Sequence, residues 1–379
     1  MLSKNSYFCG QINYSSNKMQ IGLIGLSYSG KTTLFQTLTQ IHLDIKSNTK
    51  KDSNQAIVKV PDNRLDYLTN IFNPKKKVNA TIELVDIAGL QKGDRTATQF
   101  NTQVINKIKT NDALIHIVRG FEDEQIPHTE GSIDMFRDIQ TIDDELLITD
   151  LAFVETRIEK IEKDMMKTKD KDAMKRELDA MIKWKEQLEN NSPLRDLDFT
   201  EDEHRYLKNY QPMTAKPMLI ALNLNEGDVK KAEQIVADIE SKIKGKNVSI
   251  IPFFAKIEME LSSMEESDKE VFMVEYGIKD SPLDRMIRSA YNLLGLQSFF
   301  TVGEDETRAW TIKKGMTAQQ AAGTIHTDFY NKFIRAEVVS YQDFVTFGSI
   351  NGCKDNGCFR LEGKEYICKD GDILNIRHS

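Results

Sequence analysis

The stretch GLSYSGKTT, residues 25–33, decides the fold. Its two glycines, lysine and threonine complete the pattern G-x-x-x-x-G-K-T of a phosphate-binding loop, which follows a buried strand and opens a helix. The flanks supply both elements: MQIGLI at 19–24 is a short apolar run, and the apolar residues of KTTLFQTL at 31–38 would share one helical face. We therefore expect a P-loop domain.

The chemistry of such a loop is direct. Glycines let backbone N–H groups turn inward around phosphate oxygens, and the helix N-terminus adds partial positive charge. Lys31 would reach the terminal phosphates, and the Thr32 hydroxyl could bind Mg²⁺. The alternative, a glycine-rich turn that only happens to precede a helix, does not require this lysine and threonine.

Further apolar runs rich in β-branched residues follow the loop. They are TIELVDIAG at 81–89, DALIHIVRGF at 112–121, KPMLIALN at 216–223 and VSIIPFF at 248–254. Because they are continuous rather than alternating, they resemble strands buried on both faces of a parallel sheet. With helical patterns between them, they predict an α/β fold class with a mostly parallel sheet.

Two of these strands end in polar residues with recognisable spacing. Asp86 and Gly89 form D-x-x-G, in which the Asp holds Mg²⁺ and the Gly N–H senses the γ-phosphate. Leu90 follows, where Ras-like GTPases place a water-orienting Gln, so any water positioning must come from elsewhere. An ordinary polar strand end is the competing interpretation for the second motif, NLNE at 223–226.

That second motif stands where GTPases carry N-K-x-D, whose Asp binds guanine N1–H and the 2-amino group. Adenine has an acceptor at N1 and no 2-amino group, so a carboxylate aimed there gains nothing. Asn223 can still bond N7 and the 6-amino group of adenine, and Glu226 is one methylene longer than Asp. The motif favours ATP over GTP.

The rest of the chain changes character twice. Between 142 and 208 charged helical sequence predominates. Its apolar stripe steps by three or four residues: Val154, Ile158, Ile161, Met165, Met174, Leu178, Met181 and Leu188. This predicts an antiparallel pair with a coiled-coil seam, its tip at 167–173, and its charges either form a solvated surface or bind a partner. From 298 onward, strands with Gly turns predict a small β-rich module.

Composition bounds the function. The 379 residues carry a net charge of −7, so a nucleic-acid partner would have to bind a local basic patch. The candidate patches are Lys75–Lys77 and Lys313–Lys314, and the simpler interpretation of both is solvated surface. No apolar run approaches the roughly 18 residues of a membrane span, and no signal core opens the chain. We expect a cytoplasmic protein without a membrane partner.

The four cysteines are Cys9, Cys353, Cys358 and Cys368. Cys353 and Cys358 could bind a metal, but their spacing is not that of a zinc knuckle and a fourth ligand is not obvious. Reduced thiols are the better interpretation.

Longer blocks of the chain resemble the YchF/Obg-like ATPase family, a branch of the translation-factor P-loop GTPases that uses ATP. The blocks are PDNRLDYL (61–68), VDIAGL (85–90), HIVRGFED (116–123), NLNE (223–226), MIRSAYNLLGLQSFFT (286–301) and RAWTIKKGMTAQQAAGTIHTDFYNKFIRAE (308–337). The resemblance implies a P-loop G domain at 19–141 and 209–297, an inserted helical coiled-coil domain at 142–208 and a β-grasp-like TGS domain at 298–379. Residues 1–18 are expected to be a flexible extension.

The resemblance also implies ATP hydrolysis with Mg²⁺. It implies binding to the ribosome, through the large subunit and rRNA, and a monomeric protein. It implies nucleotide contacts from Tyr28, Ser29, Gly30, Lys31, Thr32 and Thr33. Leu224 would pack against the base, and His116, at the end of a strand, would assist hydrolysis in place of the missing Gln. A structural histidine in the sheet is the competing interpretation.

The chain departs from the family at three places. Ser27, Tyr28 and Ser29 replace Pro, Asn and Val in the loop. The stretch SNTKKDSNQA at 47–56 has no clean counterpart of the first-switch Thr, although Thr49, Asp52 and Ser53 lie near its place, and QKGDRTATQF at 91–100 is poor in glycine. These changes leave two hypotheses: a slow ATPase that acts as a ribosomal switch, or a ribosome- or RNA-binding protein that holds ATP with little hydrolysis. An ordinary GTPase is a third.

Overall fold

The computed structural model describes residues 19–42, 55–87, 100–167, 171–243, 245, 247–278 and 280–379. The chain forms two compact units. We call residues 19–58 and 83–293 the P-loop unit, and residues 59–82 and 294–379 the C-terminal unit.

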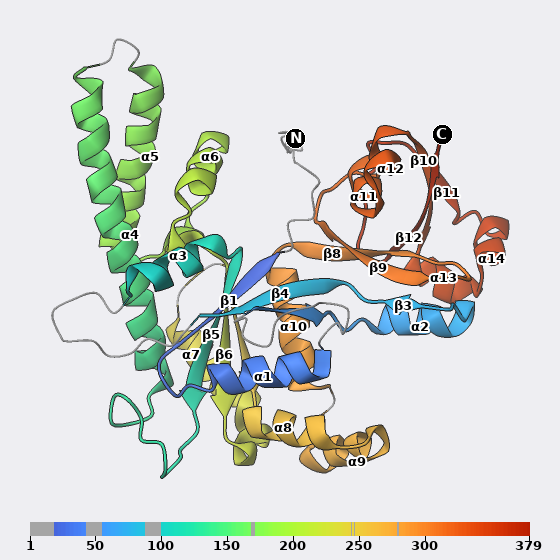
Figure 1. Ribbon diagram of the computed structural model, residues 1–379, viewed down its shortest axis with the longest axis horizontal. Helices are drawn as coiled ribbons and strands as arrows, with labels where there is room; N and C mark the ends of the chain where they lie inside the picture. The colour runs from blue at the N-terminus through green and yellow to red at the C-terminus, as the bar shows by residue number, and fades with distance from the viewer. Residues whose placement is uncertain are drawn as a thin grey trace. The chain divides into compact units, whose positions relative to one another are not determined.

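A six-stranded sheet forms the centre of the P-loop unit (Figure 1). The strands lie in the order β2 (Gln55–Lys59), β4 (Thr81–Asp86), β1 (Gln20–Ile24), β5 (Ala113–Gly120), β6 (Met218–Leu224) and β7 (Val248–Phe253). Every neighbouring pair from β4 to β7 is parallel. All seven residues of β6 are buried, as the continuous apolar run predicts. The expected α/β class with a mostly parallel sheet is confirmed.

Several helices of the unit alternate with these strands. They are α1 (Lys31–His42), α3 (Thr102–Thr110), α7 (Ala232–Lys242), α8 (Ala255–Ser263), α9 (Glu266–Tyr276) and α10 (Pro282–Leu293), with a short 3₁₀ segment, η3 (Glu226–Lys231). The helix α8 is fixed to α10 by Glu258, which is 1% exposed. Its carboxylate accepts hydrogen bonds from the Leu283 N–H (3.0 Å) and the Ser281 hydroxyl (3.3 Å), and burial raises the pKa of Glu258 to about 7.

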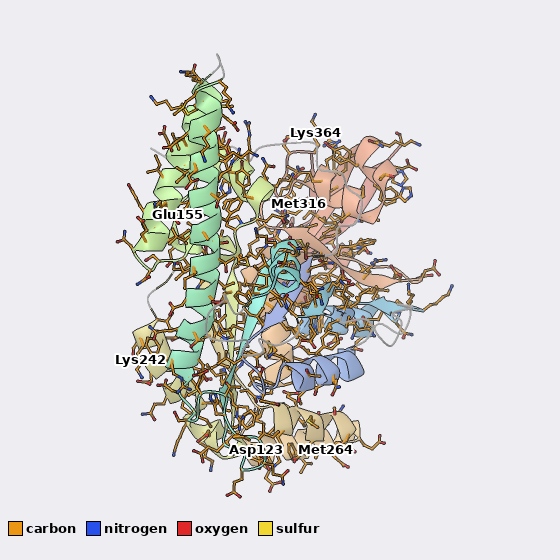
Figure 2. The ribbon with its side chains drawn as sticks, turned by 60° about the vertical axis from the view of Figure 1, so that its left-hand side comes forward. Asp123, Glu155, Lys242, Met264, Met316 and Lys364 are labelled. Carbon is orange, nitrogen blue, oxygen red and sulfur yellow. The ribbon has the colours of Figure 1, made fainter. Side chains whose placement is uncertain are left out.

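A long helical hairpin is part of the same unit (Figure 1). It consists of α4 (Met135–Met165) and α5 (Asp172–Glu189), followed by η1 (Leu194–Asp196), α6 (Glu201–Tyr210) and η2 (Met213–Ala215). Val154, Ile161, Met181 and Leu188 of the predicted stripe are buried together with Trp184. Glu155, labelled in Figure 2, lies on α4 and accepts a salt bridge from Lys185 of α5 at 3.0 Å.

The helix α4 begins seven residues before the 142 expected from the sequence. Its first turns carry Ile139, Ile142 and Leu146, which are buried in the core of the sheet and not in the hairpin. One continuous helix therefore packs on the sheet with its first half and forms the hairpin with its second.

Two buried charged groups lie where β6 begins, at the amino edge of the sheet. The Lys216 ammonium donates to the carbonyls of Lys109 (2.8 Å) and Asn111 at the end of α3, and burial lowers the pKa of Lys216 to about 8. The Asp150 carboxylate accepts from the N–H groups of Met213 (3.1 Å) and Thr214 (2.7 Å). Both groups therefore hold neighbouring backbone in place.

The C-terminal unit has its own six-stranded sheet. The strands lie in the order β11 (Arg360–Glu362), β10 (Phe333–Ser340), β12 (Asp372–His378), β8 (Leu296–Thr301), β9 (Thr307–Lys313) and β3 (Lys77–Val78). Its helices are α2 (Asn63–Phe72), α11 (Ala318–Ile325), α12 (Thr327–Asn331), α13 (Tyr341–Phe347) and α14 (Ile350–Asp355). Phe299, Ala321, Val338 and Leu374 are buried in its core.

Residues 59–82 are built into this C-terminal unit, although they fall within the 19–141 segment expected for the P-loop domain. Arg64 of α2 forms a salt bridge to Asp370 at 2.7 Å, and the Phe72 ring stacks on Phe344 with centroids 5.5 Å apart. The strand β3 pairs in parallel with β9. The boundaries proposed for the coiled-coil and TGS domains stay predictions.

The three lysines of the basic run at 75–77 all have acidic partners within this unit. Lys75 pairs with Asp305 (2.8 Å), Lys76 with Glu306 (2.7 Å) and Lys77 with Asp66. Paired ammonium groups of this kind attract phosphate less than free ones, which favours the solvated-surface interpretation of the run.

Candidate nucleotide-binding site

The predicted site residues meet at the carboxyl edge of the sheet in the P-loop unit. The loop 25–30 follows β1, Asp86 is the last residue of β4, and Asn223 lies at the end of β6. Because β1 lies between β4 and β5, and β6 is next to β5, these groups come from adjacent strands of one edge. That edge is where open parallel sheets bind ligands.

The glycines of the loop are required by space and by backbone conformation. Gly30 has φ 98°, and a Cβ there would lie 2.4 Å from the Asn223 amide nitrogen. Gly25 has φ 148°, and its Cβ would lie 2.4 Å from the carbonyl oxygen of Ile117. Side chains at either position would force the loop away from the sheet.

Lys31 is the first residue of α1, and its side chain lies against the loop that precedes it. Its ammonium donates to the carbonyls of Gly25 (2.9 Å) and Leu26 (2.7 Å), and its side chain is 6% exposed. Burial lowers the pKa of Lys31 to about 8, and the negative charge of Asp86 opposes that shift. A bound phosphate would add negative charge and so favour the protonated lysine.

Asp86 and Thr32 are the residues that would hold Mg²⁺. Burial raises the pKa of Asp86, while the charges of Lys31 and Lys107 lower it, and its Oδ1 atom has no partner among the described residues. A buried carboxylate oxygen without a partner fits a hard cation, and Thr32 is exposed on the first turn of α1. Gly89, Leu90 and the first-switch candidates Thr49, Asp52 and Ser53 lie outside the described residues.

Asn223 connects two loops of the site. Its amide nitrogen donates to the Ser29 carbonyl at 3.1 Å, and its Oδ1 accepts from the Ala255 N–H at 3.2 Å. Only 2% of the residue is exposed. Asn223 therefore positions the P-loop and the start of α8, and any contact with a base would use its remaining hydrogen and lone pair.

The two following predicted residues differ in exposure. Leu224 is 4% exposed and belongs to the apolar core, so little of its surface is available to a ligand. Glu226 is partly exposed and its Oε1 atom accepts from the Lys256 ammonium at 2.6 Å.

The expectation that His116 ends a strand is wrong. It is the fourth of eight residues in β5, paired with Ile24 of β1 and Ile220 of β6, and it is fully buried. The strand continues past the start of the P-loop because Ile117 and Val118 extend the buried run. Neither ring nitrogen has a partner among the described residues, and burial, with the charges of Lys31 and Arg195, lowers the pKa of His116 to about 3. The imidazole is therefore neutral.

The residues that depart from the family pattern have unusual environments. Tyr28 adopts the left-handed conformation (φ 62°), which is costly for a non-glycine residue, and is 63% exposed. Ser29 is buried, and its hydroxyl has no partner in the described part of the chain. Thr33, which does not depart from the pattern, continues the helix, and its carbonyl accepts a hydrogen bond from the Thr37 hydroxyl.

Lys256 was not identified from the sequence. It is the second residue of α8, three residues after the end of β7, and none of the predicted motifs includes it. The order of parallel strands could have indicated it, because each strand of this sheet delivers its next residues to the same edge.

The cysteines and the helices of the chain are the other candidates, for a metal site and for membrane spans. Among the described residues no three His, Cys, Asp or Glu side chains are grouped to hold a metal, so Cys353 and Cys358 lack further ligands there. Within the same residues, no helix is long and apolar enough to cross a membrane.

Comparison with known proteins places this site in a family. A model described as "50S ribosome-binding GTPase" matches residues 20–224, and a model of the YchF GTPase C-terminal region, described as a protein of unknown function, matches 296–379. "Ribosome-binding ATPase YchF" of Bacillus subtilis is 42% identical over 360 residues, 94% of this chain and 98% of that protein. The chain belongs to the YchF family.

Eukaryotic relatives of this YchF family member agree. "Obg-like ATPase 1" of Caenorhabditis elegans is 36% identical and covers 94% of this chain and 91% of that protein. The solved structure of the Schizosaccharomyces pombe YchF GTPase matches with a TM-score of 0.85 at 32% identity, over 95% of this chain and 98% of that one. The match therefore extends over both compact units.

Proposed function

We propose that the protein is an Mg²⁺-dependent ATPase that acts as a nucleotide-controlled switch at the ribosome. The observation that carries the proposal is the arrangement of Lys31 and Asp86 at the carboxyl edge of the sheet: Lys31 is buried, Asp86 is half-buried, and each shifts the pKa of the other. The names of its relatives, ribosome-binding ATPases, support both the reaction and the partner.

The residues divide the work as follows. Lys31 neutralises charge on the terminal phosphates, and the loop Tyr28–Thr33, with the Gly89 N–H, surrounds them. Thr32 and Asp86 would hold Mg²⁺, which when bound neutralises phosphate charge. Asn223, Leu224 and Glu226 form the base end and favour ATP over GTP.

We further propose that His116 orients the attacking water once nucleotide binding makes its ring accessible. The second candidate, a ribosome- or RNA-binding protein that holds ATP with little hydrolysis, is favoured by the complete burial of this ring. Contact with the large subunit and its rRNA, a monomeric state and a cytoplasmic location complete the proposal.

Single-turnover hydrolysis of ATP tests the reaction. We expect ADP formation that requires Mg²⁺ and stops in EDTA, and tighter binding of ATP than of GTP. Co-sedimentation with ribosomes in ATP and in ADP tests the switch, because a switch requires different affinities in the two states. ATP binding without turnover would establish the second candidate.

A further inference from the structure

The base end of the site contains an ion pair. Glu226 is the first residue of η3, three residues after Asn223, and its Oε1 atom lies 2.6 Å from the Lys256 ammonium. Lys256 is the second residue of α8, and the residue before it, Ala255, donates its N–H to Asn223. Asn223 therefore fixes the backbone at the start of α8, and the next residue of that helix, Lys256, pairs with Glu226.

This pairing changes what the carboxylate can recognise. A free carboxylate at this place suits guanine, whose N1–H and 2-amino groups are both donors. Here one oxygen of Glu226 is already bound to an ammonium. Lysine carries three N–H donors and no acceptor, so it can bind a ligand acceptor while it keeps Glu226.

The Watson–Crick edges of the two purines differ at the atom that such a donor would meet. Adenine presents an acceptor at N1 beside a donor, the 6-amino group, which matches an ammonium beside a carboxylate. Guanine presents a donor at N1, and a donor facing an ammonium makes no hydrogen bond and loses its hydration.

We propose that Lys256 is a specificity-determining residue, whose ammonium donates to N1 of adenine and opposes N1–H of guanine. The inference rests on the proposed function, because it assigns the base preference of that same site. Glu226 positions the ammonium and accepts from the 6-amino group.

The side chains are exposed enough for this role. Lys256 is 70% exposed and Glu226 31%, and an ion pair at this exposure contributes little to folding. Replacing Lys256 therefore tests recognition rather than stability. A matched control is Lys242, labelled in Figure 2, which pairs with Asp238 at 2.8 Å and is 46% exposed at the end of α7.

The experiment compares the full chain with Lys256→Met and Lys242→Met by equilibrium titration of ATP, GTP and 1-deaza-ATP. We expect Lys256→Met to bind ATP about tenfold more weakly than wild type, because a hydrogen bond from a charged group is lost. The ratio of the affinity for ATP to the affinity for GTP should therefore be smaller in Lys256→Met than in wild type. The wild-type chain should bind 1-deaza-ATP, which lacks the N1 acceptor, about tenfold more weakly than ATP. Lys256→Met should bind both equally, and Lys242→Met should behave as wild type.

Each other outcome has one meaning. The inference is overturned if the wild type binds ATP but Lys256→Met keeps the wild-type ratio of ATP affinity to GTP affinity. It is also overturned if the wild type binds 1-deaza-ATP and ATP with equal affinity. In both cases the ATPase proposal stands. If the wild type binds neither nucleotide, or binds GTP more tightly than ATP, both the proposed ATP site and the inference about Lys256 are overturned.

Discussion

Two buried lysines lie at opposite edges of the same sheet. Lys31 at the carboxyl edge and Lys216 at the amino edge each donate to two backbone carbonyls, and burial lowers the pKa of each to about 8. Burial and a shifted pKa therefore do not by themselves mark a functional lysine. The difference lies in what surrounds each one.

At the amino edge the neighbouring carboxylate, Asp150, accepts hydrogen bonds from two backbone N–H groups. At the carboxyl edge the neighbouring carboxylate is Asp86, and its Oδ1 atom has no hydrogen-bond partner among the described residues. The Ser29 hydroxyl at the same edge also has no partner among these residues. The Asn111 Oδ1 atom beside Lys216 also has no partner among the described residues, so one such atom does not mark a site. At the carboxyl edge two unpartnered oxygens, of Asp86 and Ser29, lie at the phosphate-binding loop and the strand beside it, and this combination points to a missing ligand.

The strongest test of this comparison is the pair Lys31→Met and Lys216→Met. We expect Lys31→Met to lower the single-turnover rate by roughly 100- to 1000-fold, because charge on the terminal phosphates loses its cation. Lys216→Met should lower the melting temperature and leave the rate of the folded fraction near wild type. Equal losses of rate in both variants would show that the two edges do not differ in function.

Glu258, which connects α8 to α10, should make the stability of the chain depend on pH. Its folded pKa of about 7 lies above the ordinary 4.5, so between these values the folded chain keeps a proton that the unfolded chain has released. Stability should therefore fall as pH rises from 5 to 7, by roughly 2 kcal/mol from this group. Thermal melts of wild type and Glu258→Gln across that range check it, and a wild-type advantage that does not shrink with pH would contradict the buried neutral carboxyl.

His116 lies between the two edges and belongs to neither. If it orients water, His116→Leu should lower ATP turnover about tenfold while ATP affinity is unchanged, and His116→Gln, which keeps a polar group, should restore part of the rate. The measurement is single-turnover hydrolysis beside a binding titration. Unchanged turnover in His116→Leu would leave only the structural role in the sheet.

Tyr28 should give the smallest effect. Asn tolerates the left-handed conformation better than Tyr, so Tyr28→Asn should raise the free energy of unfolding by about 0.5–1 kcal/mol. If the ring only occupies space, ATP affinity will stay the same. A clear loss of affinity, seen by titration, would instead show that the ring shields the phosphates.

Local patterns in the sequence predicted most of the phosphate end. The P-loop and Asp86 follow strands whose continuous apolar runs are unambiguous, and the carboxyl ends of parallel strands must meet. The start of α4 was missed because Ile139 and Ile142 belong to a different core from the hairpin stripe. Lys256 was missed because its partner, Glu226, is 30 residues away and only the fold brings them together.

The two-residue strand β3 has a consequence for how the chain is made. It and α2 are partners of segments synthesised much later: Arg64 and Asp370 are 306 residues apart. At about 5–20 residues per second, residues 59–82 leave the ribosome roughly 15–60 s before the surface that completes them exists. During that interval the apolar side of α2, with Leu65 and Leu68, has no final partner. Synthesis of this chain therefore includes a period in which an early segment exposes apolar residues that the finished fold buries.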